Sequence, residues 1–135
     1  MMNGRTNKQI VEDIFNELAR GNGKPFGDAM ADDFQWTIKG TTPWSRTYAG
    51  KQTVRTELLA PLFAQFDGTY TNRAKRILSD GDTVIVECEG SVVTKSGKPY
   101  CNSYCYVIEM ENGKFKSLTE YLDTALVEAV LEPPR

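Results

Sequence analysis

Apolar residues in the first half of the chain recur mostly at helical spacing. They predict an amphipathic helix over residues 7–20, which the turn Gly21-Asn22-Gly23 ends, and a short second helix over 25–31. A third helix is predicted over 54–66, with Pro61 bending or interrupting it. The chain therefore begins with helices rather than with a sheet.

Between the second and third helices, the pattern predicts one strand and one loop. Phe34, Trp36 and Ile38 alternate with other residues, so a strand with one apolar side is expected over 34–38. The segment 39–50 is rich in glycine, threonine and proline and is predicted to be a loop.

After residue 69 the apolar pattern follows strand spacing. Strands are predicted over 70–78, 83–95, 100–110 and 115–122, and a last helix over 124–131. Asp80-Gly81, Ser96-Gly97 and Asn112-Gly113 are the turn signals between the strands. This order predicts one α+β domain over 1–135, in which helices pack on the concave face of a curved, largely antiparallel sheet.

Composition and charge exclude several classes of protein. The chain has 135 residues, 40% of them hydrophobic and 25% charged, a size and composition that fit one soluble domain. It has no apolar run long enough to span a bilayer and no signal-like N-terminus, so a cytoplasmic location is expected. The 16 basic residues are scattered and the net charge is −2, which argues against a nucleic-acid partner.

The residues for several kinds of catalytic site are missing. The chain has no histidine, the commonest general base and the commonest transition-metal ligand. Its three cysteines lack the paired spacing of a zinc site or a disulfide framework. We therefore expect neither a metal nor an organic cofactor, and no serine-type triad.

Hairpin geometry predicts which side chains share a face of the sheet. A two-residue turn at Ser96-Gly97 places Glu89 opposite Tyr104, with Glu87 and Asn102 on the same face. This face carries acids, an amide and phenols among apolar residues, as a pocket would. The other face is predicted to be apolar and to form a homodimer interface through the sheet; it carries Val84, Val86, Cys88, Val92, Cys101, Cys105 and Val107.

The last strand allows two registers. A regular Asn112-Gly113 hairpin puts Tyr121 beside Tyr104 and sends Glu120 to the apolar face. One extra residue near Lys116-Ser117, a β-bulge, instead brings Glu120 to the inner face together with Leu118 and Leu122. We prefer the bulge, because the regular register leaves an acid without a partner on an apolar surface.

Three segments resemble SnoaL-like members of the nuclear-transport-factor-2-like superfamily. They are Gly97-Lys98-Pro99-Tyr100-x-Asn102-x-Tyr104, Asn112-Gly113-Lys114-Phe115 and Glu120-Tyr121-Leu122-Asp123-Thr124. In order and length the resemblance covers essentially the whole chain. It implies the cystatin-like cone with an internal pocket that ketosteroid isomerases also use, a fold that hosts many different functions.

Relatives with known chemistry narrow what the resemblance implies. Limonene-type epoxide hydrolases are similar in having an acid at the position of Glu120, but they have an arginine where this chain has Glu87. This charge reversal disfavours epoxide hydrolysis. Ketosteroid isomerases combine an aspartate base with a tyrosine and a protonated carboxylic acid, roles that Tyr104 and a neutral glutamate could fill here.

The expected chemistry is proton transfer between two carboxyl groups and a ligand. Desolvation and mutual repulsion raise the pKa of acids that share an apolar cone, so Glu89 would be the ionised base and Glu120 the acid. The ligand would be a small, largely apolar carbonyl compound, and the enzyme an isomerase, cyclase or hydratase. Its predicted contacts are Glu87, Asn102, Tyr104, Trp36, Trp44 and Phe63, with Trp44 closing the cone mouth.

A second function remains open. The same acids could be structural, held by Tyr104 or Asn102, in a dimeric module that binds a small hydrophobic molecule without catalysis. Trp36 and Phe63 could likewise be ordinary core residues, because aromatic side chains dominate protein cores.

Overall fold

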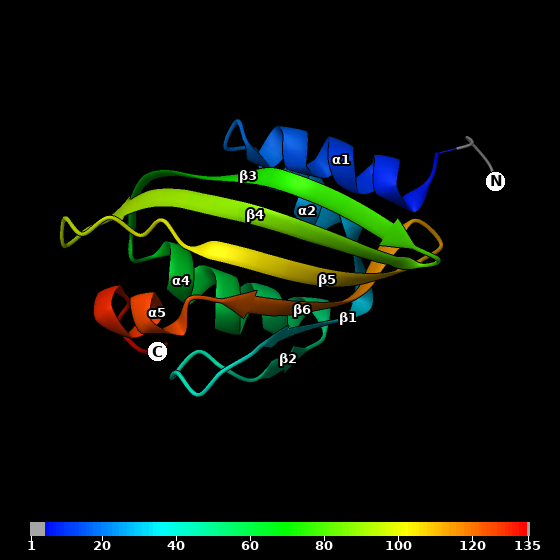
Figure 1. The fold of residues 1–135 in the computed structure, drawn as a ribbon. Helices are drawn as coiled ribbons and strands as arrows, with labels where there is room; N and C mark the ends of the chain where they lie inside the picture. Colours follow the sequence, from blue (N-terminus) through cyan, green and yellow to red (C-terminus); the bar gives the residue numbers. More distant parts are fainter. Residues whose placement is uncertain (1–4, 135) are drawn as a thin grey trace.

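The computed structural model describes residues 5–134, which form a curved sheet with helices on one side of it (Figure 1). The chain begins with two helices and ends with a meander of strands and one short helix. In chain order the elements are α1 (Asn7–Leu18), α2 (Lys24–Ala29), β1 (Met30–Ile38), β2 (Thr47–Ala49), α3 (Lys51–Thr53), η1 (Val54–Leu59), α4 (Ala60–Phe63), β3 (Phe66–Asp80), β4 (Thr83–Thr94), β5 (Ser103–Glu111), β6 (Lys114–Leu122) and α5 (Thr124–Val130).

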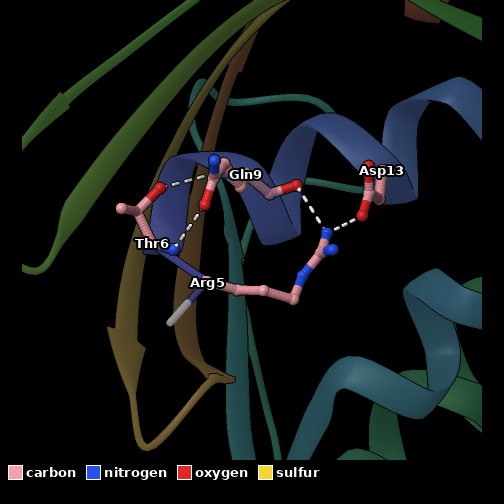
Figure 2. A network of polar contacts seen from close by, with 4 residues as sticks. All are labelled: Arg5, Thr6, Gln9 and Asp13. Carbon is pink, nitrogen blue, oxygen red and sulfur yellow. Dashed lines mark hydrogen bonds and ion pairs between the residues drawn. The ribbon is translucent and has the colours of Figure 1, made fainter. Parts of the chain in front are cut away.

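The start of α1 is fixed by local polar contacts (Figure 2). The Thr6 hydroxyl accepts a hydrogen bond from the Gln9 backbone, and the Gln9 side chain accepts one from the Thr6 backbone, which is a capping box. Arg5 donates to the Gln9 carbonyl at 3.3 Å and pairs with Asp13. The two capping-box bonds satisfy N–H groups that the start of a helix would otherwise leave unpaired.

The third predicted helix is present, but it runs over 51–63 instead of 54–66 and is irregular. A wide π-helical turn, η1, precedes α4, and the Ala60 N–H donates to the Arg55 carbonyl five residues earlier. Pro61 follows at once; it has no N–H, and in a regular helix its ring would clash with the carbonyl four residues back. The wide turn accommodates this proline. The helix ends at Phe63, and Phe66, which we predicted as helical, begins β3.

The sheet is mixed, with strand order β2-β1-β6-β5-β4-β3. β1 runs parallel to β6, whereas all the other neighbouring strands are antiparallel. The segment 39–50, predicted to be a loop, contains β2 at the sheet edge. The α+β fold with helices on one side of a curved sheet is confirmed. Among residues 5–134, no helix is long and apolar enough to cross a bilayer.

The connection between β4 and β5 differs from the prediction by one residue. Thr94 pairs with Lys98 through a 2.8 Å hydrogen bond, so the loop contains three residues, with Gly97 at φ +87°. Three-residue hairpins place a glycine in this left-handed region. Because strand side chains alternate, a one-residue change moves every side chain to the other face. Cys88, not Glu89, is therefore opposite Tyr104, and the predicted register was wrong.

The predicted bulge in the last strand is confirmed. Glu109 pairs with Ser117 and Met110 with Phe115, so Lys116 is the extra residue. After this bulge Leu118 and Glu120 are buried on the inner face. The bulge therefore determines that Glu120 points into the fold.

Candidate functional site

Glu87 and Glu89 lie on the outer face of the sheet and not in a pocket. Glu87 accepts two 3.0 Å hydrogen bonds from the Arg76 guanidinium, and Lys75 lies 3.8 Å from Glu89. Both glutamates are exposed. The prediction that they line the inner wall was wrong, because it assumed a two-residue loop between β4 and β5. The expected pair of acids is therefore absent from the interior.

In β4, the side chains predicted to form the dimer interface instead face the interior of the cone. Val84, Val86, Cys88 and Val92 are buried in the core cluster. Their partners across β5 are also turned inward, because Tyr104 faces Cys88 and Tyr106 faces Val86. The outer face carries Glu87 and Glu89 in their place, which removes the apolar surface from which the dimer was inferred.

Glu120 is the buried acid of the interior. It is 5% exposed, and it alone among the buried residues that the structure describes carries an acidic or basic side chain. The Trp36 indole N–H donates to Glu120 Oε1 at 2.8 Å, and no described residue donates to the other carboxyl oxygen. Burial raises the pKa of this carboxyl to about 7, although the hydrogen bond from Trp36 opposes the increase. The group can therefore give or take a proton near neutral pH.

A cavity of about 320 Å³, the large chamber, lies beside Trp36 inside the cone. Its wall is almost entirely apolar, apart from Asn72 and the phenols of Tyr70 and Tyr106. The lining residues are Leu18, Gly21, Gly23, Phe26, Trp36, Leu59, Phe63, Phe66, Gly68, Tyr70, Asn72 and Tyr106.

A second cavity of about 70 Å³, the small chamber, has Glu120 in its wall. It shares Trp36, Leu59, Phe63, Tyr70 and Tyr106 with the large chamber, so the two adjoin. The other lining residues are Ile38, Trp44, Leu58, Leu62, Tyr100, Tyr104, Leu122, Val127 and Leu131. A ligand could thus place a polar end beside Glu120 and an apolar body in the large chamber.

Phenol groups and one amide form a polar cluster in these walls. Tyr70 donates to the Tyr104 oxygen at 3.5 Å, and Asn72 Nδ2 donates to Tyr70 at 3.3 Å and to Tyr106 at 3.5 Å. Burial raises the pKa of Tyr70, Tyr104 and Tyr106, and the nearby Glu120 charge raises each further. These phenols stay neutral and keep an O–H hydrogen to donate.

Sequence reasoning selected Tyr104 but missed Tyr70, Asn72 and Tyr106 as wall residues. Tyr70 and Asn72 are two residues apart, so on a strand their side chains point to the same face, as those of Tyr104 and Tyr106 do. This spacing was a signal that could have identified them. The side chain of Tyr70 also needs Gly90, since a Cβ there would lie 2.5 Å from the Tyr70 hydroxyl. The close approach of Tyr70 to Gly90 joins two strands and cannot be recognised from the sequence.

The other residues predicted to contact a ligand differ in their roles. Some line the chambers, and others hold parts of the fold together. Trp36 lines both chambers. Phe63 also lines both and is 47% exposed, so it lies where the cavity meets the surface. Trp44 lines the small chamber but is buried, and its indole N–H donates to the Glu132 carbonyl at 3.0 Å. Trp44 therefore holds the C-terminal segment beside the small chamber.

Asn102 lies outside both chambers, contrary to prediction. Its Nδ2 donates to the Tyr100 hydroxyl at 3.0 Å and to the Asp123 carbonyl at 3.1 Å. Its Oδ1 accepts from the Asp123 N–H at 3.1 Å. Asp123 is the N-cap of α5, so Asn102 holds the start of that helix against the sheet. In residues 5–134, no group of three or more Cys, Asp or Glu side chains is placed to hold a metal ion.

Comparisons with known proteins agree with this geometry. The profile of the SnoaL-like domain family matches residues 11–118. No curated protein matches the sequence. A similar crystal structure is that of an NTF2-like protein from Burkholderia thailandensis, with 26% identity, coverage of 96% of this chain and 99% of that one, and a TM-score of 0.79.

Two more distant structures share the fold and have more informative descriptions. A protein from Jannaschia sp. CCS1, described as a SnoaL-like polyketide cyclase, is 16% identical, with coverage of 96% and 93% and a TM-score of 0.73. TerC, crystallised with polyporic acid, is 16% identical, with coverage of 92% and 96% and a TM-score of 0.76.

Proposed function

Because the chain belongs to the SnoaL-like domain family, we propose that it binds a small, largely apolar carbonyl compound and transfers a proton to or from it through Glu120. It would act without a metal or organic cofactor, as an isomerase, cyclase or hydratase. One observation carries the proposal. A single carboxyl group, with a pKa of about 7, faces an apolar chamber and has one hydrogen-bond donor, Trp36.

One carboxyl group can perform both halves of such a reaction. Ionised Glu120 takes a proton from a carbon next to the carbonyl, and the protonated carboxyl then returns it to another atom of the same ligand. The negative charge that develops on the carbonyl oxygen needs hydrogen-bond donors, and the Tyr104 and Tyr106 phenols line the same chamber. A pKa near the working pH is the most effective value for this exchange.

Structural neighbours support binding of an organic molecule in a cone of this kind. TerC was crystallised with polyporic acid, and the Jannaschia protein is described as a polyketide cyclase. For this chain, the apolar walls of the large chamber and the acid in the small chamber suit a ligand with a polar end and an apolar body.

Deuterium exchange at an enolisable ketone tests the proposal. The probe is 2-tetralone in D₂O at pD 7, followed by proton NMR. Wild-type protein is expected to accelerate exchange next to the carbonyl, and Glu120→Gln to lose roughly 10²- to 10⁴-fold of that acceleration, the usual contribution of acid–base catalysis. Glu87→Gln is the matched control, because Glu87 lies on the outer face, paired with Arg76.

Two results would count against catalysis. Exchange at the wild-type rate in Glu120→Gln would remove Glu120 from the reaction. Binding of 2-tetralone without faster exchange would support the second candidate, a non-catalytic ligand-binding module. The observation that favours this candidate is the position of Glu89, which is exposed beside Lys75 and leaves Glu120 without a second acid in the cavity.

A homodimer through the outer face of the sheet also remains a proposal. Fewer apolar side chains support it than predicted. The outer face has Val107 and Cys105, both partly exposed, and Tyr121, which is 47% exposed, but charged residues lie among them. Light scattering at micromolar concentration is expected to give twice the 15.1 kDa mass of the chain. A monomer mass at that concentration would refute the dimer.

A further inference from the structure

The Glu120 carboxyl has no positively charged partner among residues 5–134. Neither chamber has a lysine or an arginine among the described residues that line it. The basic side chains near the strands pair on the outside instead, such as Arg76 with Glu87. A buried carboxylate without a counter-charge is unfavourable, because its attraction to water has been lost and nothing replaces it. A ligand that brings a positive charge would replace it.

Aromatic rings surround this carboxyl group. Seven of the fifteen residues that line the small chamber are aromatic. They come from separate parts of the fold: β1, the segment before β2, α4, β3, the segment before β5, and β5. These residues are Trp36, Trp44, Phe63, Tyr70, Tyr100, Tyr104 and Tyr106. The negative face of an aromatic ring attracts a cation, more strongly where water is excluded.

We propose that the small chamber also binds a small organic cation of the quaternary ammonium type, held between the Glu120 carboxylate and the surrounding aromatic rings. This ligand class goes beyond the carbonyl compound proposed above. Both ligand classes begin from the ionised carboxylate, which pairs with the positive charge of the cation and takes a proton from the carbonyl compound.

The size of the chamber suits such a head group. A cavity needs about 10–15 Å³ of space open to the centre of a water molecule in order to hold one water-sized group. The small chamber has about 70 Å³ of such space, which is room for roughly five groups of that size. A trimethylammonium group is of this size. Any chain attached to it would extend past Trp36 and Phe63 into the large chamber, whose walls are apolar.

Among the buried residues of the described chain, no other acid competes with Glu120 for the cation. Burial raises the pKa of six titratable groups that interact with this carboxyl, so these six are neutral at physiological pH. These groups are the phenols of Tyr48, Tyr70, Tyr100, Tyr104 and Tyr106 and the thiol of Cys88. The charge-dependent part of the preference for a cation should therefore come from Glu120, and the aromatic rings add to it.

Choline and 3,3-dimethylbutan-1-ol form a matched pair of probes, because they have the same shape and differ only in a positive nitrogen in place of a carbon. Isothermal titration at pH 8.5 is expected to show choline binding at least about tenfold more tightly than the alcohol. Glu120→Gln is expected to lower this ratio at least about fivefold, because only the attraction of the aromatic rings remains. Glu87→Gln, on the outer face, should leave it unchanged.

The wild-type protein provides a second test that needs no variant. Choline does not titrate, so lowering the pH from 8.5 to 5.5 changes only the protein, and the choline preference should fall at least about fivefold as Glu120 is protonated. Equal binding of the two probes at pH 8.5, or no choline binding at millimolar concentration, would overturn the proposal. Failure of the 2-tetralone exchange would leave it standing, since that experiment does not test cation binding.

Discussion

Glu120→Gln is expected to make the folded protein more stable at pH 8, although it removes the group on which the proposed chemistry depends. The pKa of the Glu120 carboxyl rises from its ordinary value of 4.5 to about 7 on folding. Ionising the buried acid at pH 8 therefore lowers the free energy of unfolding by an amount on the order of 3 kcal/mol. Glutamine carries no charge and still offers an oxygen to the Trp36 indole N–H, so it avoids this loss.

The direction of the pKa shift determines the pH range over which the free energy of unfolding changes. A carboxyl group whose pKa is raised by folding binds its proton more tightly in the folded state. Its stabilising contribution is thus complete below about pH 4.5 and is lost as the pH rises through about 7. Glu120→Gln and wild type should differ little at pH 4.5, and the difference should grow between pH 5 and 7.5.

Urea unfolding followed by circular dichroism at several pH values measures this difference directly. Glu89→Gln is the matched control, because Glu89 is exposed and should change stability by less than about 1 kcal/mol at every pH. If Glu120→Gln were less stable than wild type at pH 8, the ionised carboxylate would have to be favourably solvated in the fold. That outcome would also remove the main support for Glu120 as a proton donor near neutral pH.

Phe115→Ala is expected to cause the largest loss of stability, about 3–5 kcal/mol in the free energy of unfolding. The Phe115 side chain is 0% exposed. Its ring centroid lies 5.1 Å from that of Phe26 in α2 and 6.3 Å from that of Phe34 in β1. Phe115 therefore joins β6 to both elements, and its removal would leave a cavity at the centre of the core. It would also loosen the parallel pairing of β1 with β6, which brings Trp36 to Glu120.

Phe63→Ala makes the same chemical change at an exposed position. Because Phe63 is 47% exposed, its replacement should cost about 1 kcal/mol or less, although it would widen the opening shared by the two chambers. Urea unfolding measures both variants under identical conditions. Equal losses for the two phenylalanines would show that Phe115 does not anchor the core as the ring contacts indicate.

Much of the fold could be predicted from the sequence because its signals are local. Helical spacing located α1, and turn residues located the meander of strands. Asn112-Gly113 predicted the β5–β6 hairpin, with Asn112 and Gly113 at φ of 54° and 76°. The bulge at Lys116 was also predictable, because one extra residue was needed to bring both Leu118 and Glu120 to the inner face.

The β4–β5 connection could not be predicted in the same way. Ser96-Gly97 fits a loop of two residues or of three, and the dipeptide alone does not distinguish them. The choice depends on which side chains of β4 fit inside the cone, where Val86 and Cys88 are buried while Glu87 pairs with Arg76 outside. Because side chains alternate along a strand, this single residue decided whether Glu87 and Glu89 were pocket acids or surface residues.

The sequence by itself determined the order of the longer helices and strands and the absence of histidine from the chain, and it favoured the inward turn of Glu120 without deciding it. Only the tertiary structure decided that Glu120 is the one acid of the described interior, that Trp36 donates to it, and that Tyr70 and Asn72 join Tyr104 and Tyr106. The physical reason is the distance along the chain over which each interaction acts. Spacing and turn chemistry act between neighbours in the chain, whereas burial and the pKa of Glu120 depend on side chains that meet only when β1, β3, β5 and β6 come together.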